Sequence, residues 1–229
     1  MFYYWDPTYI LVIFALILSM IASFGVNATF NKYKKQKTAR SITGAEAARR
    51  VLDMNGLQNI KIEHISGNLT DHFDPRAGVI RLSDATYNDT SVAAVGVAAH
   101  EAGHAVQHAV GYTPIKVRNS IVPIVNIGNA LSMPLFLIGL LLNMMGLAYL
   151  GVILFSLTLV FQLVTLPVEF NASRRAISIL DSSMLLYEDE IGPAKKVLRA
   201  AAMTYVAAVA ATALQLLRFL LIIGGRRDD

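Results

Sequence analysis

The chain has 229 residues, of which 55% are hydrophobic and only 16% charged, a composition that excludes an ordinary soluble domain and indicates a membrane protein. The absence of cysteine excludes disulfides and thiolate metal sites, so any metal must be held by His, Asp or Glu. The net charge of +4 does not indicate a nucleic-acid partner, because five cations gather in residues 32–40, directly after an apolar span.

Residues 8–31 are the first predicted transmembrane helix, because they carry no charge and are long enough to cross a hydrocarbon core of about 30 Å. Tyr3, Tyr4, Trp5 and Tyr9 stand at its start, where an aromatic belt is expected. A cleaved signal peptide is disfavoured, because the cations follow the apolar run instead of preceding it. The same cations are predicted to stay in the cytoplasm, which puts the N-terminus outside and the next segment inside.

A cytoplasmic α+β region is predicted over residues 32–117. A capping box between Thr43 and Glu46 opens a short helix that runs from Gly44 to about Met54. Three short strands separated by turn residues follow it, over residues 59–65, 68–73 and 78–82. The last strand is expected at an edge of the sheet, where an extended peptide could add as a further strand.

Residues 91–111 are predicted to form the helix that organises the chain, because it carries the sequence His100-Glu101-Ala102-Gly103-His104. Positions four apart lie on one face of a helix, so both imidazoles can bind one zinc ion. Glu101 is turned by about 100° and can act on water at the metal without binding it. The alternative is a polar surface turn of an ordinary helix. His108 is expected at the rim, because three helical turns spread over about 12 Å.

Fifty residues without a formal charge lie between Arg118 and Glu169, which is enough for two membrane crossings. We predict two transmembrane helices, over residues 119–142 and 147–167, joined by a tight external turn. A cytoplasmic helical region follows over residues 168–199, and then a fourth apolar helix over residues 200–223. The cytoplasmic helical region is expected to contain a helix over residues 176–190 and a new helix from Gly192-Pro193. The fourth apolar helix contains Arg218, so it either crosses the membrane or lies in the interface.

A catalytic zinc keeps three protein ligands, so a third ligand must follow the two histidines. The metzincin pattern is excluded, because the chain has Gln107 and Val110 where that class has Gly and His. An intramembrane aspartate ligand is disfavoured, because no Asp stands between Asp89 and Asp181.

Glu169 is the predicted third ligand, because it is the first acidic residue after the motif and the hydrophobic hairpin returns it to the cytoplasmic side. The alternative for Glu169 is a surface ion pair with Arg174 or Arg175. Glu188 and Glu190 are the reserve candidates, although they are expected in a solvated acidic turn.

Four separated motifs resemble the YugP-like neutral zinc metallopeptidases of bacterial membranes, and more distantly the membrane gluzincins such as the CAAX prenyl proteases. The motifs occupy residues 69–76, 100–104, 166–176 and 200–206. The resemblance implies a gluzincin-like catalytic subdomain, one Zn²⁺ per chain, and hydrolysis of peptide bonds in membrane-associated proteins. It also implies a multi-pass protein of the cell membrane with a cytoplasmic active site, and quality control of membrane proteins as a candidate role.

In the membrane gluzincins the third ligand belongs to a Glu-x-x-x-Asp motif whose Asp orients a ligating histidine. Ser173 stands at the place of that Asp, so Ser173, Asn171 or a backbone carbonyl is expected to orient the histidine.

The sequence therefore predicts a mainly α-helical integral membrane protein with three or four transmembrane helices and a small α+β cytoplasmic subdomain. Glu101 is the predicted general base of a zinc metalloprotease, and the candidates for stabilising the oxyanion are His72, Arg175 and Tyr205. Protein substrates and the lipid bilayer are the expected partners; no particular oligomeric state is indicated. The rival interpretations are a scaffold or chaperone with a structural zinc and a transporter with a His–Glu relay.

Overall fold

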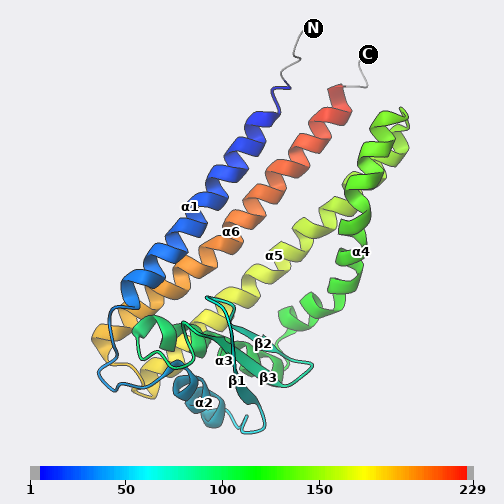
Figure 1. The fold of residues 1–229 in the computed structure, drawn as a ribbon. Coiled ribbons are helices and arrows are strands. Elements are labelled where there is room, and N and C mark those ends of the chain that lie inside the picture. Colours follow the sequence, from blue (N-terminus) through cyan, green and yellow to red (C-terminus); the bar gives the residue numbers. More distant parts are fainter. Residues whose placement is uncertain (1–5, 226–229) are drawn as a thin grey trace. The chain divides into compact units, whose positions relative to one another are not determined.

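The computed structural model describes residues 6–225, over which the chain forms six helices and three strands (Figure 1). Tyr3, Tyr4 and Trp5 of the predicted aromatic belt lie outside the described residues, as do residues 226–229. The chain divides into two compact units. Among the described residues, the apolar unit is built from residues 6–23, 117–166 and 204–225, and the sheet unit from residues 24–116 and 167–203.

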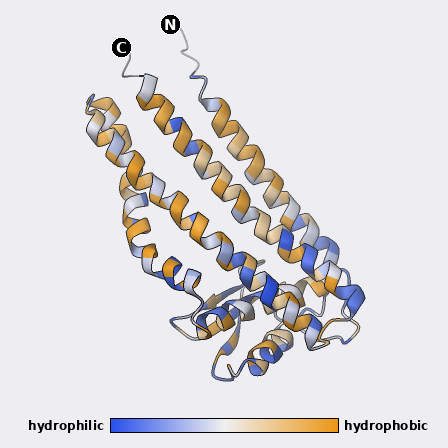
Figure 2. Cartoon of the chain, turned by 180° about the vertical axis from the view of Figure 1, so that it is seen from behind, coloured by the Kyte–Doolittle hydropathy of each residue, from blue (hydrophilic) through white to orange (hydrophobic). Residues whose placement is uncertain are grey.

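Four helices are long and apolar enough to cross a membrane, as the sequence predicts. They are α1 (Tyr9–Tyr33), α4 (Thr113–Leu141), α5 (Met145–Ser182) and α6 (Glu188–Gly225). Hydrophobic residues dominate the stretches of these helices that belong to the apolar unit, whereas hydrophilic residues gather on the stretches in the sheet unit (Figure 2). Large apolar side chains of α1, such as Ile10, Phe14 and Ile21, are exposed, an arrangement that suits lipid better than water.

In the apolar unit, small residues let α4 and α5 approach closely. A Cβ added at Gly151 would lie 2.6 Å from the backbone nitrogen of Phe136, and one added at Gly139 would lie 2.3 Å from that of Ala148. Phe219 of α6 stacks against Phe136 with ring centroids 4.3 Å apart, which joins α6 to the same core.

Arg218, which interrupts the apolar run of α6, has partners at the start of α1. Its guanidinium lies 3.4 Å from Asp6 Oδ2, donates to Thr8 Oγ1 at 3.2 Å and sits over the ring of Tyr9 at 4.4 Å. A paired arginine costs far less in an apolar setting than an unpaired one. The charge of Arg218 is therefore compatible with α6 as a fourth crossing.

The sheet unit begins with α2 (Gly44–Met54), whose predicted capping box is confirmed. The Thr43 hydroxyl accepts from the backbone N–H of Glu46 at 3.1 Å, and the Glu46 carboxylate accepts from that of Thr43 at 2.8 Å. Alanines and aliphatic side chains of α2 pack on α3 (Val92–Ala109), and the buried core continues into α5 and α6: it includes Val51, Leu52, Val95, Leu180 and Leu198.

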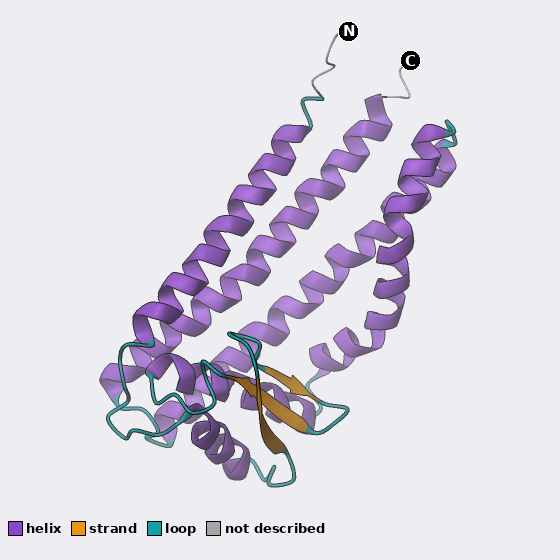
Figure 3. Ribbon diagram, in the orientation of Figure 1, coloured by secondary structure: helices purple, strands orange, loops and turns teal. Residues whose placement is uncertain are grey.

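The three strands form one sheet in the order β1-β3-β2 (Figure 3). They are β1 (Lys61–Ile65), β2 (His72–Asp74) and β3 (Val79–Ser83), with β1 parallel and β2 antiparallel to β3. The prediction that the last strand is an edge was wrong: β3 is central, because it pairs with β1 along one edge and with β2 along the other. Its Val79, Ile80 and Leu82 are buried. The second strand is also shorter than predicted, since residues 68–71 do not belong to it.

The helices after the hydrophobic hairpin are longer than the sequence indicated. Pro167 lies inside α5, which runs without a break to Ser182, so the predicted separate helix over residues 176–190 was wrong. An internal proline removes one backbone hydrogen bond but need not end a helix whose faces are packed on both sides of it. Likewise α6 begins at Glu188 instead of Gly192, with three acidic residues in its first turn, where the helix dipole favours negative charge.

Candidate metal centre

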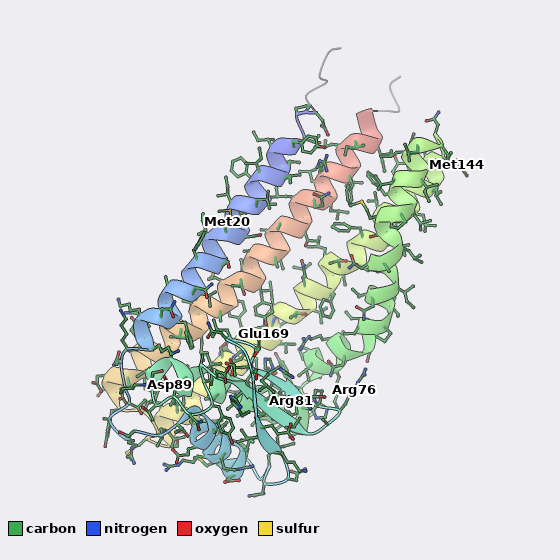
Figure 4. All side chains as sticks on the ribbon, viewed as in Figure 1. Met20, Arg76, Arg81, Asp89, Met144 and Glu169 are labelled. Atoms are coloured by element: carbon green, nitrogen blue, oxygen red, sulfur yellow. The ribbon has the colours of Figure 1, made fainter. Side chains whose placement is uncertain are left out.

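The helix that carries the motif is fixed at its first turn. Ser91 caps α3 by accepting from the backbone N–H of Ala94 at 3.2 Å, and Asp89 accepts in turn from the backbone N–H of Ser91 at 2.7 Å (Figure 4). Lys37 lies 3.0 Å from the same Asp89 oxygen, and its backbone pairs with Ser91. The chain segment that follows α1 therefore anchors the start of α3.

His100 and His104 of α3 and Glu169 of α5, which Figure 4 labels, meet at one point within the sheet unit. Glu169 Oε2 lies 3.3 Å from His100 Nε2 and 3.5 Å from His104 Nε2, and the three potential ligand atoms lie within 4.8 Å of one another. The side chains of the two histidines and the glutamate are 14%, 12% and 4% exposed, respectively. The structure thus brings together the three residues that the sequence singled out as ligands.

The separations between these atoms fit a tetrahedral zinc site. Two ligand atoms about 2.0–2.1 Å from zinc, at a tetrahedral angle, lie roughly 3.3–3.5 Å apart, and the two N···O distances here are 3.3 and 3.5 Å. Among the described residues, the only ion-pair partners of the nearly buried Glu169 carboxylate are these two histidines. A buried carboxylate needs a cation, and a metal bound at this point would supply it.

Ser173 holds His100 from behind. Its hydroxyl lies 3.1 Å from His100 Nδ1, the ring nitrogen that faces away from Glu169. A proton on Nδ1 that is donated to the Ser173 oxygen leaves Nε2 with a free lone pair toward the metal position. Ser173 therefore occupies the orienting position that the resemblance to the membrane gluzincins suggested.

Gln107 holds His104 in the same way, a contact that the sequence analysis missed. Gln107 Oε1 lies 3.0 Å from His104 Nδ1, while its Nε2 donates to the carbonyl of Val168 at 2.8 Å and to Asn171 Oδ1 at 3.0 Å. Because a carbonyl can only accept, the amide has one orientation, with its oxygen toward His104. His104 must then donate from Nδ1, which leaves its Nε2 free for a metal.

The signal for Gln107 was present in the sequence. It stands three residues after His104 on the same helix, a spacing at which side chains meet. Its neighbour Asn171, one of the predicted orienting residues, acts one step further out by accepting from Gln107 and from Arg175 Nε at 2.8 Å.

The electrostatics of the site favour a positive charge. Burial lowers the pKa of His104, but its hydrogen bond with Glu169 and the negative charges of Glu101 and Glu169 outweigh burial and raise the pKa above its ordinary value. Glu101 is 9% exposed and follows His100 directly on α3. A metal ion at this point would compete with the proton for His104.

Gly103 allows the two ligand-bearing helices to touch. A Cβ at this position would lie 2.8 Å from the backbone carbonyl oxygen of Ala172 in α5, closer than such atoms approach in practice. The glycine lies between the two histidines in sequence, and Ala172 lies between Glu169 and Ser173. The absence of a side chain at Gly103 is what lets α5 present its carboxylate to α3.

The other predicted site residues have different positions. His72 is exposed on β2, where its Nδ1 lies 2.9 Å from the carbonyl of Thr70 and its Nε2 3.5 Å from Arg81. Arg175 is engaged with Asn171, and Tyr205 belongs to the apolar unit. His108 is exposed beside Phe73 and outside the cluster of three, in agreement with its predicted position at the rim.

Of the two reserve ligands, Glu190 has a structural contact that the prediction of a solvated turn did not foresee. It is 3% exposed, and its carboxylate accepts from the backbone N–H groups of Ala39 and Tyr187, each at 2.8 Å. Glu190 therefore ties the segment after α1 to the start of α6, while Glu188 is exposed at the first residue of that helix.

Two comparisons with known proteins match nearly the whole chain. A family model described as "Putative neutral zinc metallopeptidase" matches residues 8–224. The chain is 47% identical over 219 residues to a Bacillus subtilis protein described as "Putative membrane protease YugP", an alignment that covers 96% of this chain and 97% of that protein. No solved structure matches the chain.

Proposed function

Because this chain belongs to the family described as "Putative neutral zinc metallopeptidase", we propose that it is a membrane-spanning zinc metalloendopeptidase that cleaves proteins at the cytoplasmic face of the cell membrane. The observation that carries the proposal is the convergence of His100, His104 and Glu169, with both histidines held at Nδ1. Two nitrogens and one carboxylate oxygen form the donor set of a catalytic zinc, which keeps one position open for water and substrate.

His100, His104 and Glu169 would hold one zinc ion per chain. Zinc, when bound, supplies Lewis-acid polarisation of the scissile carbonyl and makes water more acidic. Glu101 takes a proton from the attacking water and passes it to the nitrogen of the leaving amine, as a general base and then a general acid. Ser173 and Gln107 keep the two imidazoles in the tautomer that can bind metal.

Stabilisation of the oxyanion is assigned to His72 in preference to Arg175. The Nε of Arg175 already donates to Asn171, which places Arg175 in the network behind His104. His72 is exposed on β2, an edge strand next to which an extended substrate could lie. A donor of this kind is typically worth about 3–4 kcal/mol in the transition state.

The proposed cytoplasmic position of the site follows from the distribution of charge. Arginines and lysines follow the apolar stretch of α1 and flank the apolar stretches of α5 and α6, all within the sheet unit: Lys32, Lys34, Lys35, Arg174, Arg175, Lys195, Lys196 and Arg199. Basic residues next to membrane helices are retained on the cytoplasmic side. The substrates proposed are therefore membrane-associated proteins with cytoplasmic segments, which would suit a role in membrane-protein quality control.

The test uses the full-length protein purified in detergent, with casein and a detergent-solubilised membrane protein as substrates. We expect chelator-sensitive cleavage by the wild type and a rate at least about a hundredfold lower for Glu101→Gln, which should still contain zinc. Glu169→Gln should lose both zinc and activity, whereas Glu188→Gln, an exposed acid on α6, should change neither. Zinc-containing wild type that cleaves nothing, or active Glu101→Gln, would overturn the proposal in favour of a structural zinc site.

A further inference from the structure

A groove of about 460 Å³ lies between α5 and α6 within the sheet unit. It adjoins the metal centre without containing any of its three ligands. Its lining combines three cations with an apolar floor and one serine: Arg174, Lys195, Arg199, Phe170, Ile177, Leu198, Ala202 and Ser173.

The positive charge of this groove is uncompensated. Arg174, Lys195 and Arg199 are exposed, and the structure gives none of them an ion pair or a side-chain hydrogen bond within residues 6–225. No carboxylate lines the groove. By contrast, other cations of the sheet unit are paired. Arg81, labelled in Figure 4, lies 3.0 Å from Asp74, and Arg49 lies 2.8 Å from Asp53. Three unpaired cations around one hollow favour a ligand that carries a concentrated negative charge.

The apolar floor excludes a simple anion site. Phe170 of α5 is 40% exposed and Ile177 is partly exposed, while Leu198 and Ala202 of α6, which also line the groove, are nearly buried. A free phosphate would not contact this apolar floor favourably. A ligand with a hydrocarbon chain would cover the floor and gain free energy in proportion to the apolar area that it buries. The lining therefore fits an amphiphile with an anionic head.

The groove also lies where both helices change from apolar to basic. In α5 the charge-free stretch of the hairpin ends at residue 168, six residues before Arg174. In α6 the next charge-free stretch starts at residue 200, directly after Arg199. The phosphate level of a bilayer is expected at such transitions, because apolar segments occupy the hydrocarbon core and cations next to them reach the headgroups.

We propose that this groove binds an anionic phospholipid, with the phosphate between Arg174, Lys195 and Arg199 and an acyl chain along Phe170 and Ile177. Basic pockets between membrane helices on the cytoplasmic side are typical sites for anionic headgroups. This inference shares one assumption with the proposed function, namely that α5 and α6 are inserted in a membrane. A bound lipid would contact Ser173, whose hydroxyl lies 3.1 Å from His100 Nδ1, so the site also adjoins the residue that orients a metal ligand.

The test measures lipid binding to the full-length protein in detergent by native mass spectrometry, with phosphatidylglycerol and phosphatidylcholine of the same acyl chains. We expect phosphatidylglycerol to bind in one tight site, and the triple variant Arg174→Gln, Lys195→Gln and Arg199→Gln to weaken it on the order of a hundredfold. Phosphatidylcholine should bind both proteins equally weakly. Equal binding of the two lipids by the wild type would overturn the proposal.

A matched control changes the same amount of charge elsewhere in the sheet unit. Lys34→Gln, Lys35→Gln and Lys196→Gln together remove three cations that do not line the groove, including the immediate neighbour of Lys195. This variant should keep its affinity for phosphatidylglycerol within about threefold, since diffuse attraction is screened by salt. If it loses as much affinity as the groove variant, binding is diffuse and the groove is not a site.

Two further measurements are needed. The first distinguishes a lipid phosphate from a soluble phosphate, and the second distinguishes the lipid proposal from the protease proposal. Inorganic phosphate and glycerophosphoglycerol, which lack acyl chains, should not displace phosphatidylglycerol at equal concentration; displacement would identify a soluble phosphate ligand and overturn the lipid. The Glu101→Gln variant should bind phosphatidylglycerol as the wild type does, because lipid binding does not need proteolysis. The lipid result can therefore be interpreted even if the protease assay fails, and the protease result can be interpreted even if no lipid binds.

Discussion

At the scale of single residues, the two histidines proposed as ligands are oriented by different side chains. His104 depends on Gln107, which is fully buried and joins His104 to the backbone of α5 at Val168. Gln107→Met keeps the volume of the side chain but removes its three hydrogen bonds, to His104, Val168 and Asn171. We expect zinc affinity to fall about 10- to 100-fold, the usual effect of losing such a partner, as measured by competition with a chromophoric chelator. Gln58→Met at an exposed position is the control, and unchanged affinity in Gln107→Met would show that His104 needs no partner.

The side chain at position 173 should tune the zinc affinity of the site through its hydrogen bond with His100. Its neutral hydroxyl is a weaker acceptor for Nδ1–H than the carboxylate that membrane gluzincins have at this place. We expect zinc affinity to follow the order Ser173→Asp, wild type, Ser173→Ala, with each step between about threefold and a hundredfold. Ser178→Ala, an exposed serine of the same helix, should match the wild type in the same titration. An inverted order would mean that Ser173 does not orient the ring.

The sequence was sufficient to predict that His100, His104 and Glu169 come together, because that follows from spacing or from elimination. His100, Glu101 and His104 are recognisable from one helical turn, and Glu169 because no other acid precedes it after the motif. Gln107 was missed because its role depends on the fold: its partner Val168 is 61 residues away. Glu190 was misjudged for the same reason, since nothing in its local acidic sequence shows that Ala39 needs an acceptor.

At the scale of elements, the contact between α3 and α5 should be the sensitive one. Gly103→Ala places a methyl group 2.8 Å from the carbonyl oxygen of Ala172, so the two helices must move apart. We expect a loss of about 1–3 kcal/mol in the free energy of unfolding and a lower zinc affinity, because Glu169 retreats from the histidines. Denaturant unfolding of the zinc-free protein and zinc titration measure the two effects separately.

Gly96 provides a matched control on the same helix. A Cβ at this position would meet the Cβ of Ala194 at 3.7 Å, an ordinary van der Waals distance. Gly96→Ala should therefore stabilise the protein by up to about 1 kcal/mol through helix propensity and leave zinc affinity unchanged. If both variants behave alike, the close approach at Gly103 is not what positions Glu169.

Element boundaries were predictable where a local signal sets them, and not where packing does. The capping box fixed α2 at Gly44, and Ser91 fixed the start of α3, within one residue of the prediction. The breaks expected near Pro167 and at Gly192-Pro193 did not occur, because neither proline ends a helix whose neighbouring turns are packed. The strand order was equally out of reach, since it depends on which strand is buried on both faces.

At the scale of the whole molecule, the metal centre connects segments that are distant in sequence. Glu169 lies 65 residues after His104 in the sequence, and the charge-free hairpin lies between them. A metal held from both sides would close this loop only in the folded chain, so the proposed zinc binding would be linked to folding of the sheet unit.

Removal of the metal should therefore lower stability in a manner specific to this site. At a free zinc concentration a hundred times the dissociation constant, binding to the folded state alone adds about 2.7 kcal/mol, which a chelator would abolish. We expect EDTA to lower the melting temperature of the wild type in detergent and added zinc to restore it. Glu169→Gln should melt at one temperature with or without EDTA, because its two remaining histidines bind zinc too weakly. An equal response of both proteins to EDTA would place the stabilising metal elsewhere, since the donor set described here cannot work without its carboxylate.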